Sequence, residues 1–299
     1  MFLVLTLLLY VGVSITVTIV YAGLHHQDGD VTTEDDWRES AMAMLHEPAA
    51  LATLAMAAQV TFLAVTVCAA WLSPMGIIRR LRLGPSGLSW AGYLTLPFGI
   101  LSINFLFEAA IKLLHVEQEG GNLDLIHNVI TQVSPAFLVV MVLVIGVMPG
   151  FAEEFLFRGY VQSRLSVRWG RGLAIFVAAA LFGLFHFDRI QSPATFLMGL
   201  YLGYVAERSG SIRPAMFAHM FNNSAVVIFS WWFARMAGEE AAVAAPVNPR
   251  AELLTAAGCL VLFALCCLYL KYRVHPPEQP QAEMPSSGGF PISNPIATA

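Results

Sequence analysis

The chain has 299 residues, of which 57% are hydrophobic and only 12% are charged, and its mean hydropathy is +0.67. Because roughly a quarter of the residues of a soluble domain are charged, this composition excludes an ordinary water-exposed globular protein and indicates a polytopic membrane protein. The small net charge of −4 gives no reason to expect a nucleic-acid partner.

Eight apolar segments follow one another along the chain. A helix needs about 20 residues to cross a bilayer, and continuous apolar runs predict helices rather than barrel strands, which would alternate. No basic region precedes the first run, so we interpret it as a retained helix, with a cleaved signal peptide as the alternative. The sixth segment is short. The segments cover residues 1–22, 48–72, 88–114, 134–163, 172–188, 194–207, 212–236 and 252–271.

Lys and Arg residues gather in alternate connections between these segments, and the remaining connections are acidic or neutral. Short cytoplasmic loops are enriched in Lys and Arg. All basic connections fall on one side, so we expect an integral, multi-pass protein of the plasma or inner membrane with both termini in the cytoplasm. The basic residues are Arg79, Arg80, Arg82, Arg164, Arg168, Arg171, Arg208, Arg213, Lys271 and Arg273.

Two adjacent carboxylates interrupt the most apolar part of the chain, in the stretch GFAEEFLFRG at 150–159. An ionisable group within a membrane helix costs about 2.5–3.5 kcal/mol, and such groups pair, face a cavity or mark function. Glu154 and Arg158 have the order and spacing of an ion pair on one helix face. Glu153 is rotated by about 100° from Glu154. It therefore lacks an intrahelical partner and is the candidate for chemistry.

Two histidines and an asparagine lie in the apolar segments that follow. His186 comes four residues after Phe182, and His219 comes four residues before Asn223, so each pair projects from one helix face. If the fourth and fifth helices form an antiparallel hairpin, Glu153 and His186 lie at about the same depth. A carboxylate and an imidazole at one depth on neighbouring helices form a plausible buried dyad.

Each of these groups also has a purely structural interpretation. A single histidine or amide in a membrane helix often only hydrogen-bonds across helices, and an ion pair at four-residue spacing is usually structural. The co-occurrence of an unpaired carboxylate, two histidines and an asparagine favours a functional site. Gly199 and Gly203 form a GxxxG pattern, which we interpret as close helix packing.

Three polar motifs occur in order on successive apolar segments: EEFLFR as EExxxR, FGLFH as FxxxH and HMFNN as HxxxN. They resemble the CPBP family of intramembrane endopeptidases, the CAAX prenyl proteases and bacteriocin-processing enzymes also called the Abi family, over about 135–228. The resemblance implies that Glu153 is the catalytic glutamate and that His186 helps to hold and activate water. His219 and Asn223 would stabilise the oxyanion. The residues expected to support the site are Glu154, Arg158 and Phe182.

The residue types leave a metal-free mechanism and a zinc site open, and we favour the mechanism without a cofactor. Glu153, His186 and His219 have the ligand types of a His₂Glu zinc centre with an open water position. However, Asn223 is a poor zinc ligand, and a Glu153 that binds zinc leaves only Glu154 as the base.

The sequence therefore predicts an all-α polytopic membrane protein, a bundle of about eight transmembrane helices with a buried polar site. The predicted activity is intramembrane hydrolysis of a peptide bond in a membrane-associated peptide or protein. The alternative is a non-enzymatic transporter, scaffold or immunity-type protein whose polar cluster is structural. The partners expected are the lipid bilayer and that substrate. The predicted units are N-terminal helices over 1–133, a CPBP-like core over 134–236, a last helix over 237–272 and a disordered Pro- and Ser-rich tail over 273–299.

Overall fold

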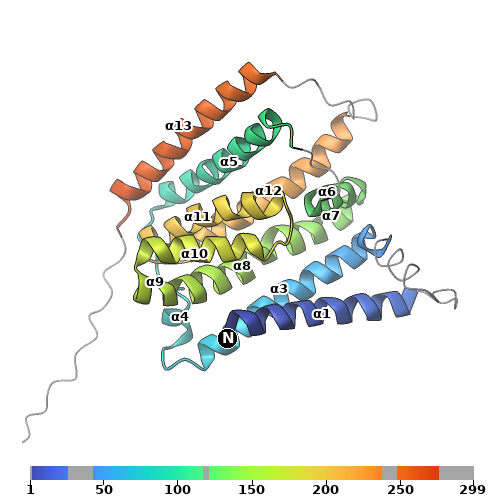
Figure 1. Ribbon diagram of the computed structural model, residues 1–299, viewed down its shortest axis with the longest axis horizontal. Helices are drawn as coiled ribbons and strands as arrows, with labels where there is room; N and C mark the ends of the chain where they lie inside the picture. Colours follow the sequence, from blue (N-terminus) through green and yellow to red (C-terminus); the bar gives the residue numbers. More distant parts are fainter. Residues whose placement is uncertain (1, 26–42, 117–120, 238–247, 276–299) are drawn as a thin grey trace, which may run out of the picture.

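The computed structural model of the chain describes residues 2–25, 43–116, 121–237 and 248–275, and the regular structure of these residues is entirely helical (Figure 1). This confirms the all-α class. Most of the acidic stretch between the first two apolar segments and almost all of the tail predicted to be disordered lie outside the described residues. The helices are α1 (Phe2–His25), α3 (Pro48–Trp71), α4 (Ile77–Arg80), α5 (Trp90–Leu113), α6 (Asn122–Gln132), α7 (Pro135–Met141), η1 (Val142–Val147), α8 (Met148–Glu154), η2 (Phe155–Gln162), α9 (Ser163–Trp169), α10 (Arg171–Leu184), α11 (Gln191–Ser209), α12 (Arg213–Ala237) and α13 (Pro249–Arg273).

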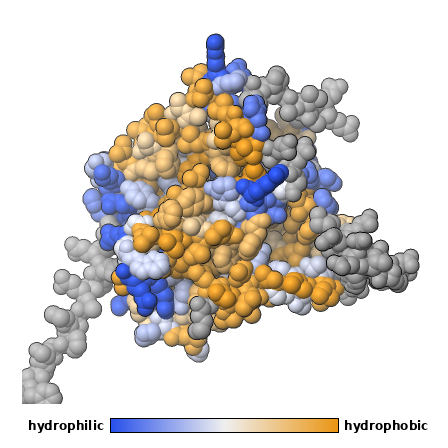
Figure 2. Space-filling model, viewed as in Figure 1, coloured by the Kyte–Doolittle hydropathy of each residue, from blue (hydrophilic) through white to orange (hydrophobic). Residues whose placement is uncertain are grey.

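Five of the eight predicted segments form helices that are long and apolar enough to cross a membrane in the described part of the chain. The chain is thus a multi-pass integral membrane protein. Between α1 and α13 a broad apolar surface is exposed on the face shown in Figure 2, as expected for side chains in contact with lipid. The five spans are Phe2–Tyr21, Pro48–Trp71, Trp90–Leu113, Pro135–Trp169 and Pro249–Arg273.

The fourth span runs without interruption through α7, η1, α8, η2 and α9, so the short α8 lies between two π-helical stretches. Pro149 has no N–H and cannot serve as the α-helical donor to the carbonyl of Ile145. The amide of Asn223 on α12 donates to that carbonyl at 3.4 Å. A methyl group at Gly150 would overlap Met220 of α12. The lack of a side chain at Gly150 lets α12 approach the long helix closely.

The long helix turns back at Gly170, whose φ of 78° falls in a region that favours glycine. The hairpin expected between the fourth and fifth segments is therefore present. Helix α10 ends at Leu184, four residues before the predicted end of its segment, so His186 lies in the loop after the helix. Phe187 next to it has a φ of 49°, which continued helix does not allow.

Helices α10 and α11 pack closely through the predicted GxxxG pattern. A methyl group at Gly199 would meet Ala179 and Phe182, and one at Gly203 would meet the amide of Gln162. Because these glycines carry no side chain, the long helix comes close enough for Arg158 to donate to the carbonyl of Gly199 and for Gln162 to donate to that of Gly203. The packing role predicted for the pattern is confirmed.

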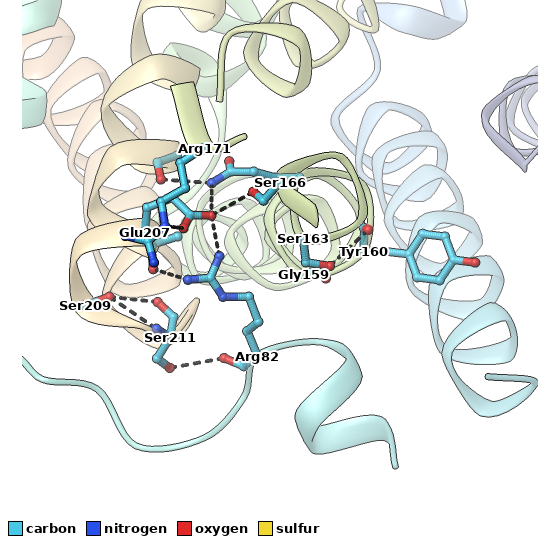
Figure 3. A network of polar contacts seen from close by, with 12 residues as sticks. Arg82, Gly159, Tyr160, Ser163, Ser166, Arg171, Glu207, Ser209 and Ser211 are labelled. Atoms are coloured by element: carbon cyan, nitrogen blue, oxygen red, sulfur yellow. Dashed lines mark hydrogen bonds and ion pairs between the residues drawn. The ribbon is translucent and has the colours of Figure 1, made fainter. Parts of the chain in front are cut away.

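The basic connections meet at one end of the bundle, which we call the basic end and which lies at the left in Figure 1. Figure 3 shows the network of polar contacts around Glu207 of α11 at this end. The Glu207 carboxylate accepts from Arg82 at 2.6 Å and from Ser166 at 3.2 Å, and Arg171 lies 3.8 Å away. Arg208 donates to the carbonyl of Leu270 at 3.2 Å. These contacts join α9, α10, α11, α13 and the connection after α4.

Candidate active site

The acidic pair lies near the middle of the long helix, and both carboxylates are buried. Glu153 is 7% exposed and Glu154 is 0% exposed. They belong to the last turn of α8, just before η2 begins. π-helical turns often occur at functional sites because they change the direction of side chains relative to a regular α-helix. Glu153 accepts from Gln59 and Glu154 accepts from Arg158, in line with their helical offset. His219 lies close to both carboxylates.

Glu154 and Arg158 form the predicted ion pair, in a fully buried position. Arg158 Nη1 donates to Glu154 Oε1 at 2.7 Å, and both side chains are 0% exposed. The second guanidinium nitrogen, Nη2, donates to the carbonyl of Gly199 at 3.1 Å. The guanidinium carbon lies 4.4 Å from the centre of the Phe182 ring, a cation–π geometry. The arginine thus neutralises Glu154 and joins the long helix to α10 and α11.

His219 of α12 lies between the two carboxylates. Its Nδ1 is 2.9 Å from Glu154 Oε1, and its Nε2 is 3.8 Å from Glu153 Oε2. An ionised carboxylate only accepts hydrogen bonds, so an ionised Glu154 requires that Nδ1 carries the proton. The imidazole is 1% exposed. His219 therefore links the neutralised carboxylate to the free one.

Glu153 has one direct hydrogen-bond donor among the described residues, and the sequence analysis did not identify it. Gln59 of α3 donates from Nε2 to Glu153 Oε1 at 2.9 Å, and the contact is buried. A search limited to ionisable groups passes over a neutral amide. The available signal was a glutamine in the middle of an otherwise apolar span.

The two asparagines of the third motif are hydrogen-bonded to each other and to different helices. Asn222 is 6% exposed and accepts from Asn104 of α5 at 2.6 Å. It also donates to Asn223 Oδ1 at 3.1 Å. Asn222 therefore holds Asn223, the motif residue, in place, and Asn104 is a further contributor that the sequence analysis missed.

His186 lies at the end of α10 with one ring nitrogen engaged. Its Nδ1 is 2.9 Å from the carbonyl of Phe182, and the two rings meet edge to face at 5.1 Å. The Phe182 ring also meets His219 edge to face at 5.8 Å. Phe182 thus packs between the two histidines, which supports its assignment to the site. Nε2 of His186 makes no hydrogen bond to any described residue.

A cavity of about 440 Å³ brings three of the four candidate residues to one surface: Glu153, His186 and Asn223. His219 does not line this cavity. It lies behind Glu153, that is, buried on the side of the carboxylate away from the cavity. The walls come from α1, α3 and the residues before it, α6, the long helix, the loop after α10, the start of α11 and α12. The lining residues are Tyr10, Ser14, Thr18, Leu45, Leu51, Leu54, Ala55, Ala58, Gln59, Phe62, Asn122, Leu125, Ile126, Val144, Ile145, Pro149, Glu153, Phe157, Phe185, His186, Gln191 and Asn223.

The loop that carries His186 is fixed to the end of the bundle opposite the basic end, which we call the distal end. Asp188 accepts from the backbone N–H of Gln191 at 2.6 Å and of Asn122 at 2.8 Å. Asn122 also donates to the carbonyl of His186 at 3.0 Å. Partial burial alone would raise the pKa of the Asp188 carboxyl, but these backbone hydrogen bonds together with Arg189 bring the pKa below its ordinary value.

The donor set does not form a ready three-ligand metal site. Zinc requires three protein ligands about 2.0–2.2 Å from the ion. In the described part of the chain, no three His, Cys, Asp or Glu side chains are grouped to hold a metal ion. Nδ1 of His219 contacts Glu154 and Nδ1 of His186 contacts a backbone carbonyl, which leaves Nε2 of each ring without a hydrogen bond to a described residue. A histidine that binds a metal commonly has its other nitrogen engaged in this way. The three side chains of the zinc alternative are not gathered around one point in the described part of the chain, and we derive no step through a metal.

This arrangement coincides with a match to a known family. Residues 135–225 match the family model described as type II CAAX prenyl endopeptidase Rce1-like. This segment is Rce1-like. The family expected from the three motifs is thereby confirmed over the segment. No curated protein and no solved structure matches the chain.

The Rce1-like segment covers less than a third of the chain but contains every candidate residue taken from the motifs. Gln59 and the α1 residues that line the cavity lie outside it. The segment thus supplies the acidic pair, the histidines and the asparagine, while the N-terminal helices close the cavity around them.

Proposed function

We propose that the protein is an intramembrane endopeptidase that hydrolyses a peptide bond in a membrane-associated peptide or protein. The observation that carries the proposal is that Glu153, the carboxylate not neutralised by Arg158, lines one cavity with His186 and Asn223. The Rce1-like match over the segment that holds these residues supports it.

Glu153 is the proposed general base that activates water. Amide hydrolysis also needs hydrogen-bond donors directed at the developing oxyanion. His186 and Asn223 reach the cavity and are the candidates for this role, with His186 also holding the water. His219 was expected from the sequence to be an oxyanion donor, but its place behind Glu153 favours a role in orienting the carboxylate. Glu154 and Arg158 support the site.

The cavity wall suggests the kind of substrate segment that is bound. Most of the lining side chains are apolar, and no Lys or Arg of the described chain is among them. A segment with neutral or apolar residues around the cleaved bond fits this lining, whereas an acidic segment would face Glu153 without a compensating cation.

A comparison of cleavage products tests the proposal. The purified protein is incubated with a membrane proteome, and new peptide termini are identified by mass spectrometry. We expect a reproducible set of cleavages that a reaction without the protein lacks. Absence of any new terminus, from protein shown to be folded, would favour the alternative of a non-enzymatic membrane protein.

The mechanism that we favour uses no metal ion, and a chelator tests this. We expect the same cleavage rate in the presence and absence of a strong divalent-metal chelator, because the arrangement relies on a carboxylate and neutral donors. A loss of activity that added zinc restores would contradict the metal-free mechanism and leave the endopeptidase proposal intact.

Gln59 is a positioning residue in this proposal, so Gln59→Met should lower kcat with little change in KM. Hydrogen bonds to charged groups contribute about 1.5–3 kcal/mol, which corresponds to a decrease of about ten- to a hundredfold. Thr53→Val on the exposed face of the same helix is the matched control and should not change kcat. If Gln59 acts by donating to Glu153, Gln59→Asn, which keeps an amide donor, should retain a higher kcat than Gln59→Met.

A further inference from the structure

The cavity meets Glu153 from the distal end of the bundle. Its outer lining residues include Asn122, at the start of α6, and Gln191, at the start of α11. The backbone N–H groups of both residues donate to the carboxylate of Asp188. Exposure falls along the cavity, from the exposed Asn122 through the half-buried His186 to the 7% exposed Glu153. The described residues that line it include none from the connections of the basic end.

The path from Glu153 to the basic end is closed by packed side chains. Every residue of η2 from Leu156 to Gln162 is buried. Phe157 packs edge to face against Phe182, and Gln162 donates to the carbonyl of Gly203. Water from the basic end therefore has no continuous route along η2 to the carboxylate.

Helix α10 is short for a membrane span. With 14 residues, α10 rises about 21 Å, less than the roughly 30 Å of a hydrocarbon core. Irregular backbone at membrane depth is tolerated where it lies against protein or a water-filled cavity. The loop over residues 185–190 contains the charged Asp188 and Arg189, so a water-filled recess on its open side meets this requirement.

The charge distribution assigns the two ends to the two sides of the membrane. Ten of the 16 Lys and Arg residues of the chain lie in connections of the basic end, and the contacts of Glu207 and Arg208 show that these connections are together in space. The positive-inside rule places this end, and with it both ends of the described chain, on the cytoplasmic side.

We infer that water and the peptide reach Glu153 from the non-cytoplasmic face of the membrane. The substrate is then a segment at the non-cytoplasmic boundary of a membrane-associated chain, or an exported peptide, with neutral or apolar residues around the cleaved bond. The direction of access stands on the cavity and the charge distribution alone, whereas the identity of the entering peptide as a substrate rests on the proposed function.

Thiol labelling from the two sides tests the direction of access. The four native cysteines (Cys68, Cys259, Cys266 and Cys267) are replaced by alanine. Gln191→Cys then reports on the cavity, and Arg168→Cys, at an exposed position of the basic end, is the matched control. A charged, membrane-impermeant methanethiosulfonate reagent is applied to right-side-out spheroplasts and to inverted vesicles of an expressing bacterium.

We expect Gln191→Cys to react at least about tenfold faster in spheroplasts and Arg168→Cys to show the opposite preference. Preferential reaction of Gln191→Cys in inverted vesicles would overturn the inference. So would its failure to react from either side while the control reacts normally. Where cleavage is detected, the labelled Gln191→Cys protein should lose it. Labelling as expected without any cleavage would contradict the proposed function and leave the direction of access standing.

Discussion

Replacing Glu153 with glutamine should abolish peptide cleavage while the protein still folds and inserts into the membrane. The change is nearly isosteric, and the oxygen of the new amide can still accept from Gln59, which lies 2.9 Å from the carboxylate. It removes the only lining carboxylate of the described cavity. Loss of a general base typically lowers a rate by about 10²–10⁴-fold, so turnover should fall below detection.

The measurement compares new peptide termini from wild type and Glu153→Gln at equal protein concentration. Thermal unfolding in detergent serves as the folding check, and the two proteins should unfold at similar temperatures. Glu207→Gln is the matched control, since it changes a partly buried carboxylate at the basic end and should keep the catalytic residues in place. Full activity in Glu153→Gln would rule out the proposed base.

Replacing Arg158 with methionine should destabilise the protein more than any other single change discussed above. The change leaves Glu154 as a buried carboxylate without its cation, and it removes the contacts to Gly199 and Phe182. Removing one partner of a buried ion pair costs about 3–5 kcal/mol. We expect a markedly lower unfolding temperature in detergent and a reduced yield of folded protein.

The double variant Glu154→Gln with Arg158→Met separates the charge effect from the packing effect. Replacing both partners of a buried pair is often close to neutral, so the double variant should recover a large part of the lost stability. Arg235→Met, which removes an exposed arginine stacked on Trp231, is the control and should cost much less. A double variant as unstable as Arg158→Met would show that the guanidinium acts mainly through Gly199 and Phe182.

The helices and their local pairs could be predicted from the sequence because both depend on short-range geometry. The apolar runs predict where helices form, and the four-residue spacing of Glu154 and Arg158 fixes their contact in any α-helix. The same reasoning left Glu153 without an intrahelical partner, as the structure shows. The basic connections were also correctly grouped, because antiparallel spans bring alternate connections to one end of the bundle.

The end of α10 was predicted less well, because hydrophobicity continues past the helix. Leu184, Phe185 and Phe187 are as apolar as the helix before them, so the sequence extends the segment to residue 188. The structure ends the helix at Leu184, and the hydrogen bonds of Asp188 and Asn122 hold the loop that follows. These partners are distant in sequence and give no periodic signal.

By itself, the sequence determined the all-helical membrane class, the ion pair of Glu154 with Arg158, and the motif residues of the Rce1-like segment. Only the tertiary structure decided that Gln59 holds Glu153, that His219 lies behind it, and that the cavity reaches the site from the distal end. Contacts within a helix follow from a fixed rise and rotation per residue. Contacts between helices depend on how their surfaces pack, and therefore on glycines and side-chain volumes throughout the bundle.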